Sequence, residues 1–139
     1  MNELLKLGKE VLASQPFSKL IGAELTVFSP GDVELTIKVT ERLKQQHGFV
    51  HGGVISYAAD NALTFAGGSV LGPGVVTSEY KINYLRPAIG SELVARATVV
   101  YSSKTRAVCR CDIYVVNEGK ENLRIVPDHA GKMRPLRGS

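Results

Sequence analysis

The segment from Val54 to about Leu71 constrains the fold more than any other part of the chain. It has the length of a long helix, and its apolar residues fall almost all around the helical projection: Val54, Ile55, Ala58, Ala59, Ala62, Leu63, Phe65 and Ala66. A helix without a wide polar face is normally buried, and the run Gly72-Pro73-Gly74 ends this one. The rest of the chain must therefore cover it.

The remaining segments supply that cover as strands. Five of them alternate apolar and polar residues with a period of two: residues 23–28, 33–39, 75–85, 92–101 and 106–116. The turn at residues 29–32 joins the first two into a hairpin. A short amphipathic helix is predicted at residues 2–14, capped by Asn2 and ended by Pro16. One buried helix followed by consecutive strands predicts an α+β fold with an antiparallel sheet wrapped around the helix.

Length and composition predict one domain over residues 1–139, with an ending from about residue 122 in which Pro127 leaves room only for a short edge strand. The net charge of +4 permits an anionic partner without naming one. We find no secretory signal and no run of roughly 20 apolar residues. We therefore expect a cytoplasmic protein with no membrane or nucleic-acid partner. Cys109 and Cys111 share one face of a strand and are expected to be reduced packing residues.

Two features of the long helix point to chemistry. Asp60 lies among apolar residues, where a carboxylate is costly unless a neighbouring donor satisfies it or a reaction uses it as a base or nucleophile. His51-Gly52-Gly53 stands where the helix begins, and the unpaired N–H groups of a helix N-terminus stabilise an oxyanion. The glycines could instead serve only a tight turn.

The spacing of these two features predicts a dimer. Gly52 and Asp60 are eight residues apart, which is roughly 12 Å along a helix. A nucleophile must lie within about 3–3.5 Å of the carbonyl that it attacks. One helix therefore cannot present both groups to one substrate. Two antiparallel copies in a two-fold dimer can, and such a dimer would hold two equivalent sites.

These residues resemble a known family. The motif Gln45-x-His47-Gly48-x-Val50-His51-Gly52-Gly53, followed by Asp60-Asn61, is similar to that of hot-dog-fold acyl-CoA thioesterases of the phenylacetyl-CoA (PaaI-type) branch. The run S-E-Y-K-I-N-Y-L-R-P at residues 78–87 resembles the strand and turn that follow it in the family. The resemblance covers about residues 17–116. It implies a hot-dog fold, with a long central helix wrapped by an antiparallel sheet, and a homodimer that often pairs again into a tetramer.

The resemblance also implies roles for individual residues in the hydrolysis of acyl-CoA to free acid and CoA. Asp60 would be the nucleophile or general base, and the Gly52 N–H would polarise the thioester carbonyl. Gln45 would orient substrate or water. Thr77 would place a hydroxyl in the site, and His51 would position the turn or contact substrate rather than transfer a proton. The family needs no metal or other cofactor.

Seven residues are candidates for substrate binding: Gly53, Asn61, Ser78, Tyr84, Arg86, Ser102 and Lys104. Arg86 and Lys104 would hold the CoA phosphates. Two alternatives remain, a non-catalytic module that binds acyl-CoA or an acyl carrier, and an enoyl-CoA hydratase of the same fold. Asp60 favours hydrolysis, because a binding module has little use for a carboxylate there. The acyl group is left open.

Overall fold

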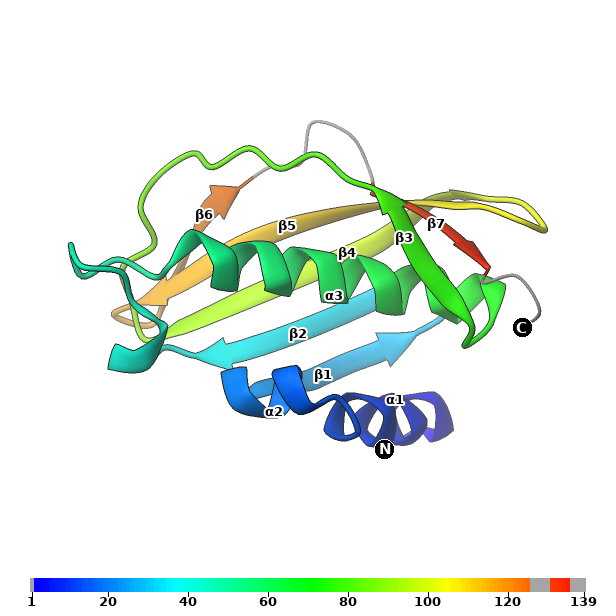
Figure 1. Cartoon of the computed structure of the whole chain (residues 1–139), viewed down its shortest axis with the longest axis horizontal. Helices are drawn as coiled ribbons and strands as arrows, with labels where there is room; N and C mark the ends of the chain where they lie inside the picture. The colour runs from blue at the N-terminus through cyan, green and yellow to red at the C-terminus, as the bar shows by residue number, and fades with distance from the viewer. Residues whose placement is uncertain (1, 126–130, 136–139) are drawn as a thin grey trace.

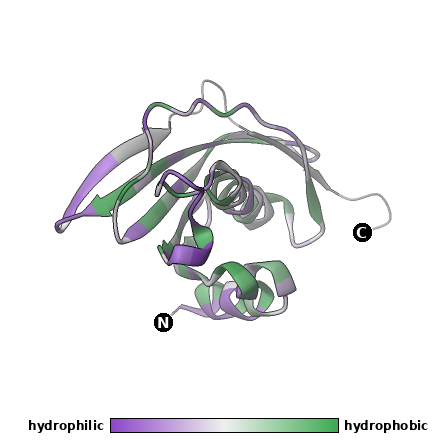
Figure 2. Ribbon diagram, turned by 60° about the vertical axis from the view of Figure 1, so that its left-hand side comes forward, coloured by the Kyte–Doolittle hydropathy of each residue, from purple (hydrophilic) through white to green (hydrophobic). Residues whose placement is uncertain are grey.

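The computed structural model describes residues 2–125 and 131–135. Its elements in chain order are α1 (Glu3–Ala13), α2 (Pro16–Ile21), β1 (Ala23–Ser29), β2 (Asp32–Lys38), the 3-10 turn η1 (Glu41–Leu43), α3 (Gly52–Leu71), β3 (Val75–Glu79), β4 (Glu92–Ser102), β5 (Ala107–Asn117), β6 (Lys120–Ile125) and β7 (Gly131–Pro135). The strands form one antiparallel sheet in the order β1-β2-β4-β5-β7-β3, with β6 paired to β5. The sheet curves around α3 (Figures 1 and 2). The predicted α+β hot-dog architecture is confirmed.

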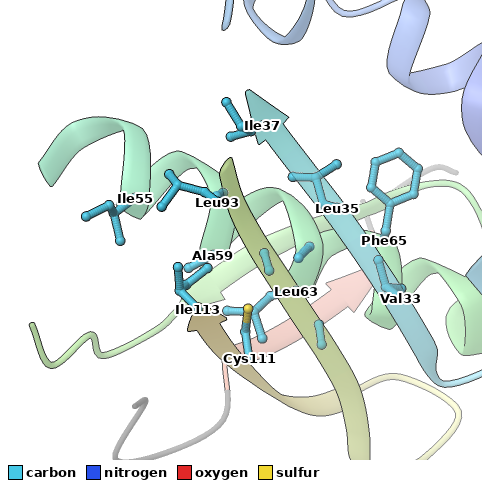
Figure 3. Packing of buried hydrophobic residues seen from close by; sticks show 14 of the residues in the cluster. Val33, Leu35, Ile37, Ile55, Ala59, Leu63, Phe65, Leu93, Cys111 and Ile113 are labelled. Atoms are coloured by element: carbon cyan, nitrogen blue, oxygen red, sulfur yellow. The ribbon is translucent and has the colours of Figure 1, made fainter. Parts of the chain in front are cut away.

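The core lies between α3 and the inner face of β2, β4 and β5 (Figure 3). On β2, the inward side chains Val33, Leu35 and Ile37 are each 1% exposed. Cys109 and Cys111 are buried free thiols on β5, and burial raises the pKa of Cys109 to about 11. They are reduced packing residues, as the sequence predicts. Among the described residues, none of the helices combines the length and apolar character that crossing a membrane requires.

One face of α3 differs from the prediction. Tyr57, Asp60, Asn61 and Thr64 recur at the spacing of a single helical face, and each is partly exposed. We call these four residues the polar strip. Their neighbours Ala58, Ala59, Ala62 and Leu63 are buried against the sheet. The helix is therefore covered on most of its circumference but not on this strip, which sequence analysis missed by treating the helix as apolar all round.

The N-terminal segment contains a helix that the sequence did not predict. The cap on α1 is confirmed, because Asn2 Oδ1 accepts a hydrogen bond of 2.6 Å from the Leu5 N–H. The helix ends at Ala13, however, and Pro16 begins α2 instead of only terminating α1. Proline suits the first position of a helix, where its missing N–H has no intrahelical acceptor. Gly22 then ends α2 in the left-handed conformation, with φ 84°.

The later part of the chain also departs from the prediction. The strand expected at residues 75–85 ends at Glu79, and residues 80–91 return to the start of α3, where the Val50 N–H donates to the Ala88 carbonyl at 3.0 Å. The short edge strand expected near the end is present as β6, which among the described strands pairs with β5 alone. The expectation is incomplete, however, because a further strand, β7, pairs with both β3 and β5. Pro127, on which that expectation depended, lies outside the described residues. The pairing of β7 depends on residues far away in sequence.

A charged cluster on the outer face of the sheet joins β6 to the other strands. Arg96 on β4 forms a bidentate pair with Glu121 on β6, at 2.6 and 2.7 Å, and reaches Glu34 on β2 at 2.8 Å. Its guanidinium lies 5.2 Å from the centre of the Tyr114 ring. The pairing with Arg96 lowers the pKa of Glu121. These contacts connect four strands, β2, β4, β5 and β6, across the face opposite α3.

The close packing of α1 on β1 yields a stability prediction. A Cβ at Gly8 would lie 2.5 Å from Phe28 Cδ2 and 2.6 Å from Leu25 Cδ2, and both of those side chains are buried. Alanine in an exposed helix position would stabilise the protein by up to about 1 kcal/mol over glycine. We predict the opposite sign here, with Gly8→Ala lowering the free energy of unfolding by about 1–3 kcal/mol in urea titrations. Lys6→Ala, an exposed position on the same helix, should have little effect. A Gly8→Ala protein as stable as wild type would contradict this packing.

Candidate active site

The first group of predicted site residues lies at the start of α3. His51 is the N-cap, and its Nδ1 accepts a hydrogen bond of 2.8 Å from the Gly53 N–H. This geometry places the proton of a neutral imidazole on Nε2. It also occupies the Gly53 N–H, so that Gly53 is not an oxyanion donor here. Within the described part of the chain, no acceptor is bonded to the Gly52 N–H, which remains the backbone donor at this end.

Gln45 and Tyr84 flank this helix start. The loop that carries Gln45 closes with the Gln45 N–H donating to the Phe49 carbonyl at 2.8 Å, and Gln45 Oε1 accepts from the His47 N–H. The loop is tied to α3 because the His51 N–H donates to the Leu43 carbonyl at 2.8 Å. Tyr84 Oη donates to the Gly52 carbonyl at 3.2 Å. Gln45, His51, Gly52 and Tyr84 thus form one group.

The second group lies at the middle of α3. Thr77 on β3 donates its hydroxyl proton to Asp60 Oδ1 at 2.8 Å. Thr64 Oγ1 lies 3.1 Å from Thr77 Oγ1 and donates to the Asp60 carbonyl at 2.8 Å. Asp60 and Thr77, which were predicted separately as site residues, are therefore in contact, and Ser78 is the exposed neighbour. Sequence analysis missed Thr64, although its position one turn after Asp60 placed it on the same helical face.

The two groups stand apart within one chain. α3 is continuous from Gly52 to Leu71, so the eight residues between Gly52 and Asp60 separate these groups by roughly 12 Å along the axis. A carbonyl bonded to the Gly52 N–H is therefore out of reach of the Asp60 carboxylate in the same chain.

The predicted substrate-binding residues are dispersed. Asn61 turns toward α2, where its Nδ2 donates to Ser18 Oγ at 3.3 Å and to Gln15 Oε1 at 3.2 Å. It also donates to Tyr57 Oη on α3 at 2.9 Å. Arg86 lies in the connection that returns to the start of α3, whereas Ser102 and Lys104 lie at the turn between β4 and β5. That turn lies at the end of the sheet where α3 finishes (Figure 1). One chain therefore does not bring Arg86 and Lys104 together.

A hollow in the described part of the chain lies away from both groups. A pocket of about 290 Å³ lies between the N-terminal helices and β1, lined by Lys9, Leu12, Ala13, Lys19, Ala23, Glu24, Leu25 and Thr26. It contains none of the predicted site residues, and we assign it no role. In the part of the chain that the structure describes, no three His, Cys, Asp or Glu side chains gather into a metal site.

Comparison with known proteins decides the family. The model of the thioesterase superfamily matches residues 47–121, which are more than half of the chain and include every member of the two groups at α3 except Gln45. The chain belongs to this superfamily. Among its relatives is the acyl-coenzyme A thioesterase PaaI of Escherichia coli, 30% identical over 109 residues, which are 78% of this chain and 76% of that protein. The predicted resemblance is confirmed, and the chain is a thioester hydrolase.

Solved structures of other thioesterases have the same fold as this chain. A thioesterase family protein from Silicibacter pomeroyi superposes with a TM-score of 0.85 at 33% identity, covering 91% of this chain and 94% of that one. A thioesterase from Haemophilus influenzae gives a TM-score of 0.80 at 27% identity, with coverages of 99% and 94%. The superfamily fold therefore extends across the described part of this thioesterase.

The contact of His51 with the helix start yields a prediction that separates two roles. If His51 only caps α3, His51→Ala lowers the free energy of unfolding by about 1 kcal/mol. His51→Asn retains a capping acceptor and should restore both the stability and most of the thioesterase kcat. If His51 were a general base, either substitution would instead lower kcat by about 10²–10⁴-fold. Thermal melts and kcat measured side by side distinguish the two, and an inactive but stable His51→Asn protein would contradict the capping role.

Proposed function

We propose that this thioesterase hydrolyses acyl-CoA, with Asp60 driving the attack on the thioester carbonyl and the Gly52 N–H holding the oxyanion. The observation that carries the proposal is the Asp60 carboxylate on the polar strip, which accepts a hydrogen bond of 2.8 Å from the Thr77 hydroxyl on β3. The acyl-CoA activity named for the Escherichia coli relative supports the choice of substrate. A CoA thioester carries its anionic phosphates far from the reacting carbonyl, which suits a site with separate binding regions.

Asp60 fits either of two routes. As a general base it takes a proton from water while the water oxygen bonds to the carbonyl carbon, and the C–S bond then breaks to release CoA thiolate. As a nucleophile it bonds directly to the carbonyl carbon, CoA leaves, and water hydrolyses the resulting anhydride. In both routes the hydrogen bond from Thr77 orients the carboxylate. Neither route calls for a metal or a cofactor other than the CoA of the substrate.

The oxyanion requires a donor that one chain does not bring to Asp60. The Gly52 N–H at the N-terminus of α3 is suited to a developing negative charge. In a two-fold dimer with antiparallel α3 helices, Gly52 of the partner subunit would approach Asp60. We therefore propose a homodimer with two shared sites. Because β3 stands at one end of the strand order, the sheet can continue into the partner beside Thr77, and a dimer of dimers is compatible with this arrangement.

The same dimer accounts for the dispersed basic residues. Arg86 belongs to the connection near the start of α3, and the turn that carries Lys104 lies near its end (Figure 1). Antiparallel helices place the end of one beside the start of the other, which brings Lys104 of the partner subunit toward Arg86. We propose that these two residues bind the CoA phosphates, with Ser102 and Tyr84 as further polar contacts.

The test of the catalytic role compares two carboxylates. Asp60→Asn keeps the size of the side chain and an oxygen that can accept from Thr77, so we predict a folded protein whose kcat with acyl-CoA falls by about 10²–10⁴. Release of free CoA thiol measures the rate.

Asp112 supplies the matched control. It is a partly buried carboxylate paired with Arg110 at 3.4 Å on β5, away from α3. Asp112→Asn should retain wild-type kcat. Activity that survives in a folded Asp60→Asn protein would contradict the assignment. A wild-type protein that binds acyl-CoA without releasing thiol would instead favour the non-catalytic binding module, and hydration of an enoyl-CoA would favour the hydratase.

A further inference from the structure

A chain of hydrogen bonds connects α2 to α3 beside Asp60. Asn61 Nδ2 donates to Tyr57 Oη at 2.9 Å, Tyr57 Oη donates to Ser18 Oγ at 2.5 Å, and Ser18 Oγ donates to Gln15 Oε1 at 2.5 Å. Ser18 is 2% exposed, and it is the only polar or charged side chain that is buried among the described residues. Burial raises the pKa of Tyr57, so its phenol stays protonated and continues to donate. This chain runs in one direction, from α3 to the start of α2.

The helix α2, which these hydrogen bonds connect to α3, carries exposed apolar side chains. The Phe17 ring meets the Tyr57 ring edge to face, with centroids 5.3 Å apart and planes at 70°. Phe17 nevertheless remains 56% exposed, and Leu20 is 68% exposed. α2 has six residues, too few for a helix to be stable on its own. Its position is therefore held by tertiary contacts: the core packing of Ile21, the ring contact of Phe17 with Tyr57, and the hydrogen bonds that Ser18 accepts from Tyr57 and Asn61.

The rings of Phe17 and Tyr57 lie on one side of the proposed catalytic residue, Asp60. Tyr57 precedes Asp60 by one turn on the polar strip, about 4.5 Å along the axis. In the other direction along the strip, Thr64 presents a hydroxyl, and Thr77 on β3 presents a second hydroxyl 3.1 Å from it. The acyl group of a thioester extends from the carbonyl that Asp60 serves, and its apolar part gains free energy by burial against apolar surface. The aromatic side of the strip offers that surface, whereas the threonine side does not.

We propose that Phe17 and Tyr57 form a wall against which the acyl group of the substrate lies, and that the hydrogen bonds of Gln15, Ser18 and Asn61 to each other and to Tyr57 set the position of this wall. We call the two rings the acyl wall. Phe17 is then a residue that determines acyl-group specificity, and Asn61 is a positioning residue instead of the direct substrate ligand that the sequence suggested. The inference rests on the proposed acyl-CoA hydrolysis and adds a location for the acyl group.

The test is a change in preference among acyl groups. For each variant, kcat/KM is measured with acetyl-CoA and hexanoyl-CoA, and the ratio of the two is compared with wild type. Phe17→Ala should lower the hexanoyl-to-acetyl ratio about tenfold, because an acetyl group has little apolar surface to place on the wall. Tyr57→Phe keeps the ring but breaks the hydrogen-bond chain, and should shift the ratio in the same direction by a smaller factor. A purely structural role would lower the melting temperature without moving the ratio.

Lys19 supplies the control on the same helix. Its side chain lines the pocket beside β1 and not the polar strip, so Lys19→Ala should leave the ratio and the activity unchanged. An unchanged ratio in a folded Phe17→Ala dimer, or an equal change in Lys19→Ala, would overturn the acyl wall. Loss of the dimer in Phe17→Ala with no change in ratio would make Phe17 a subunit contact and would also overturn it. If wild type hydrolyses neither thioester, the proposed function fails. The ratio of the dissociation constants for hexanoyl-CoA and acetyl-CoA, measured by calorimetry for each variant, then decides the acyl wall separately.

Discussion

The apolar surface of α3 is the constraint on which the rest of the structure depends. Burying a helix of 20 residues that is apolar over most of its circumference requires a sheet that curves, and β2, β4 and β5 provide the inner face of that sheet (Figure 2). Smaller features follow from the same requirement. Gly8 lets α1 pack directly against β1, and β7 joins β3 to β5 so that the sheet reaches around the helix.

The polar strip on α3 is where this enclosure stops and the chemistry of the thioesterase begins. Asp60 is bonded to Thr77 on β3, while Tyr57 and Asn61 are bonded to Ser18 on α2. The strip is therefore bordered by a polar hydroxyl pair on one side and by aromatic rings on the other. This asymmetry gives a direction to the proposed substrate, with its carbonyl at Asp60 and its acyl group toward Phe17.

Sequence patterns predicted the parts of this arrangement that depend on local periodicity and on one family motif. The length of α3, the period-two strands and the choice of Asp60 and Thr77 as site residues were accessible in this way, whereas the hydrogen bond between these two residues came from the structure. The bond between Tyr57 and Ser18 was not, because it joins residues 39 apart whose only local signal is the spacing of Tyr57 before Asp60. α2 was missed because Pro16 can end one helix or begin another. The place of β7 was missed because strand pairing depends on partners distant in sequence.

The central claim is that each active site draws on two chains, and subunit complementation tests it most directly. Gly52 is the first residue of α3, and His51 before it has φ −60° and ψ 134°, a conformation that a following proline accepts. Gly52→Pro therefore deletes the oxyanion N–H while preserving the helix start, and Gly52→Ala is the control that keeps the N–H. Mixed with Asp60→Asn and reassembled, two inactive proteins should recover roughly a quarter of wild-type activity, because half of the dimers then carry one intact site. Verified heterodimers as inactive as their parents would contradict the shared site.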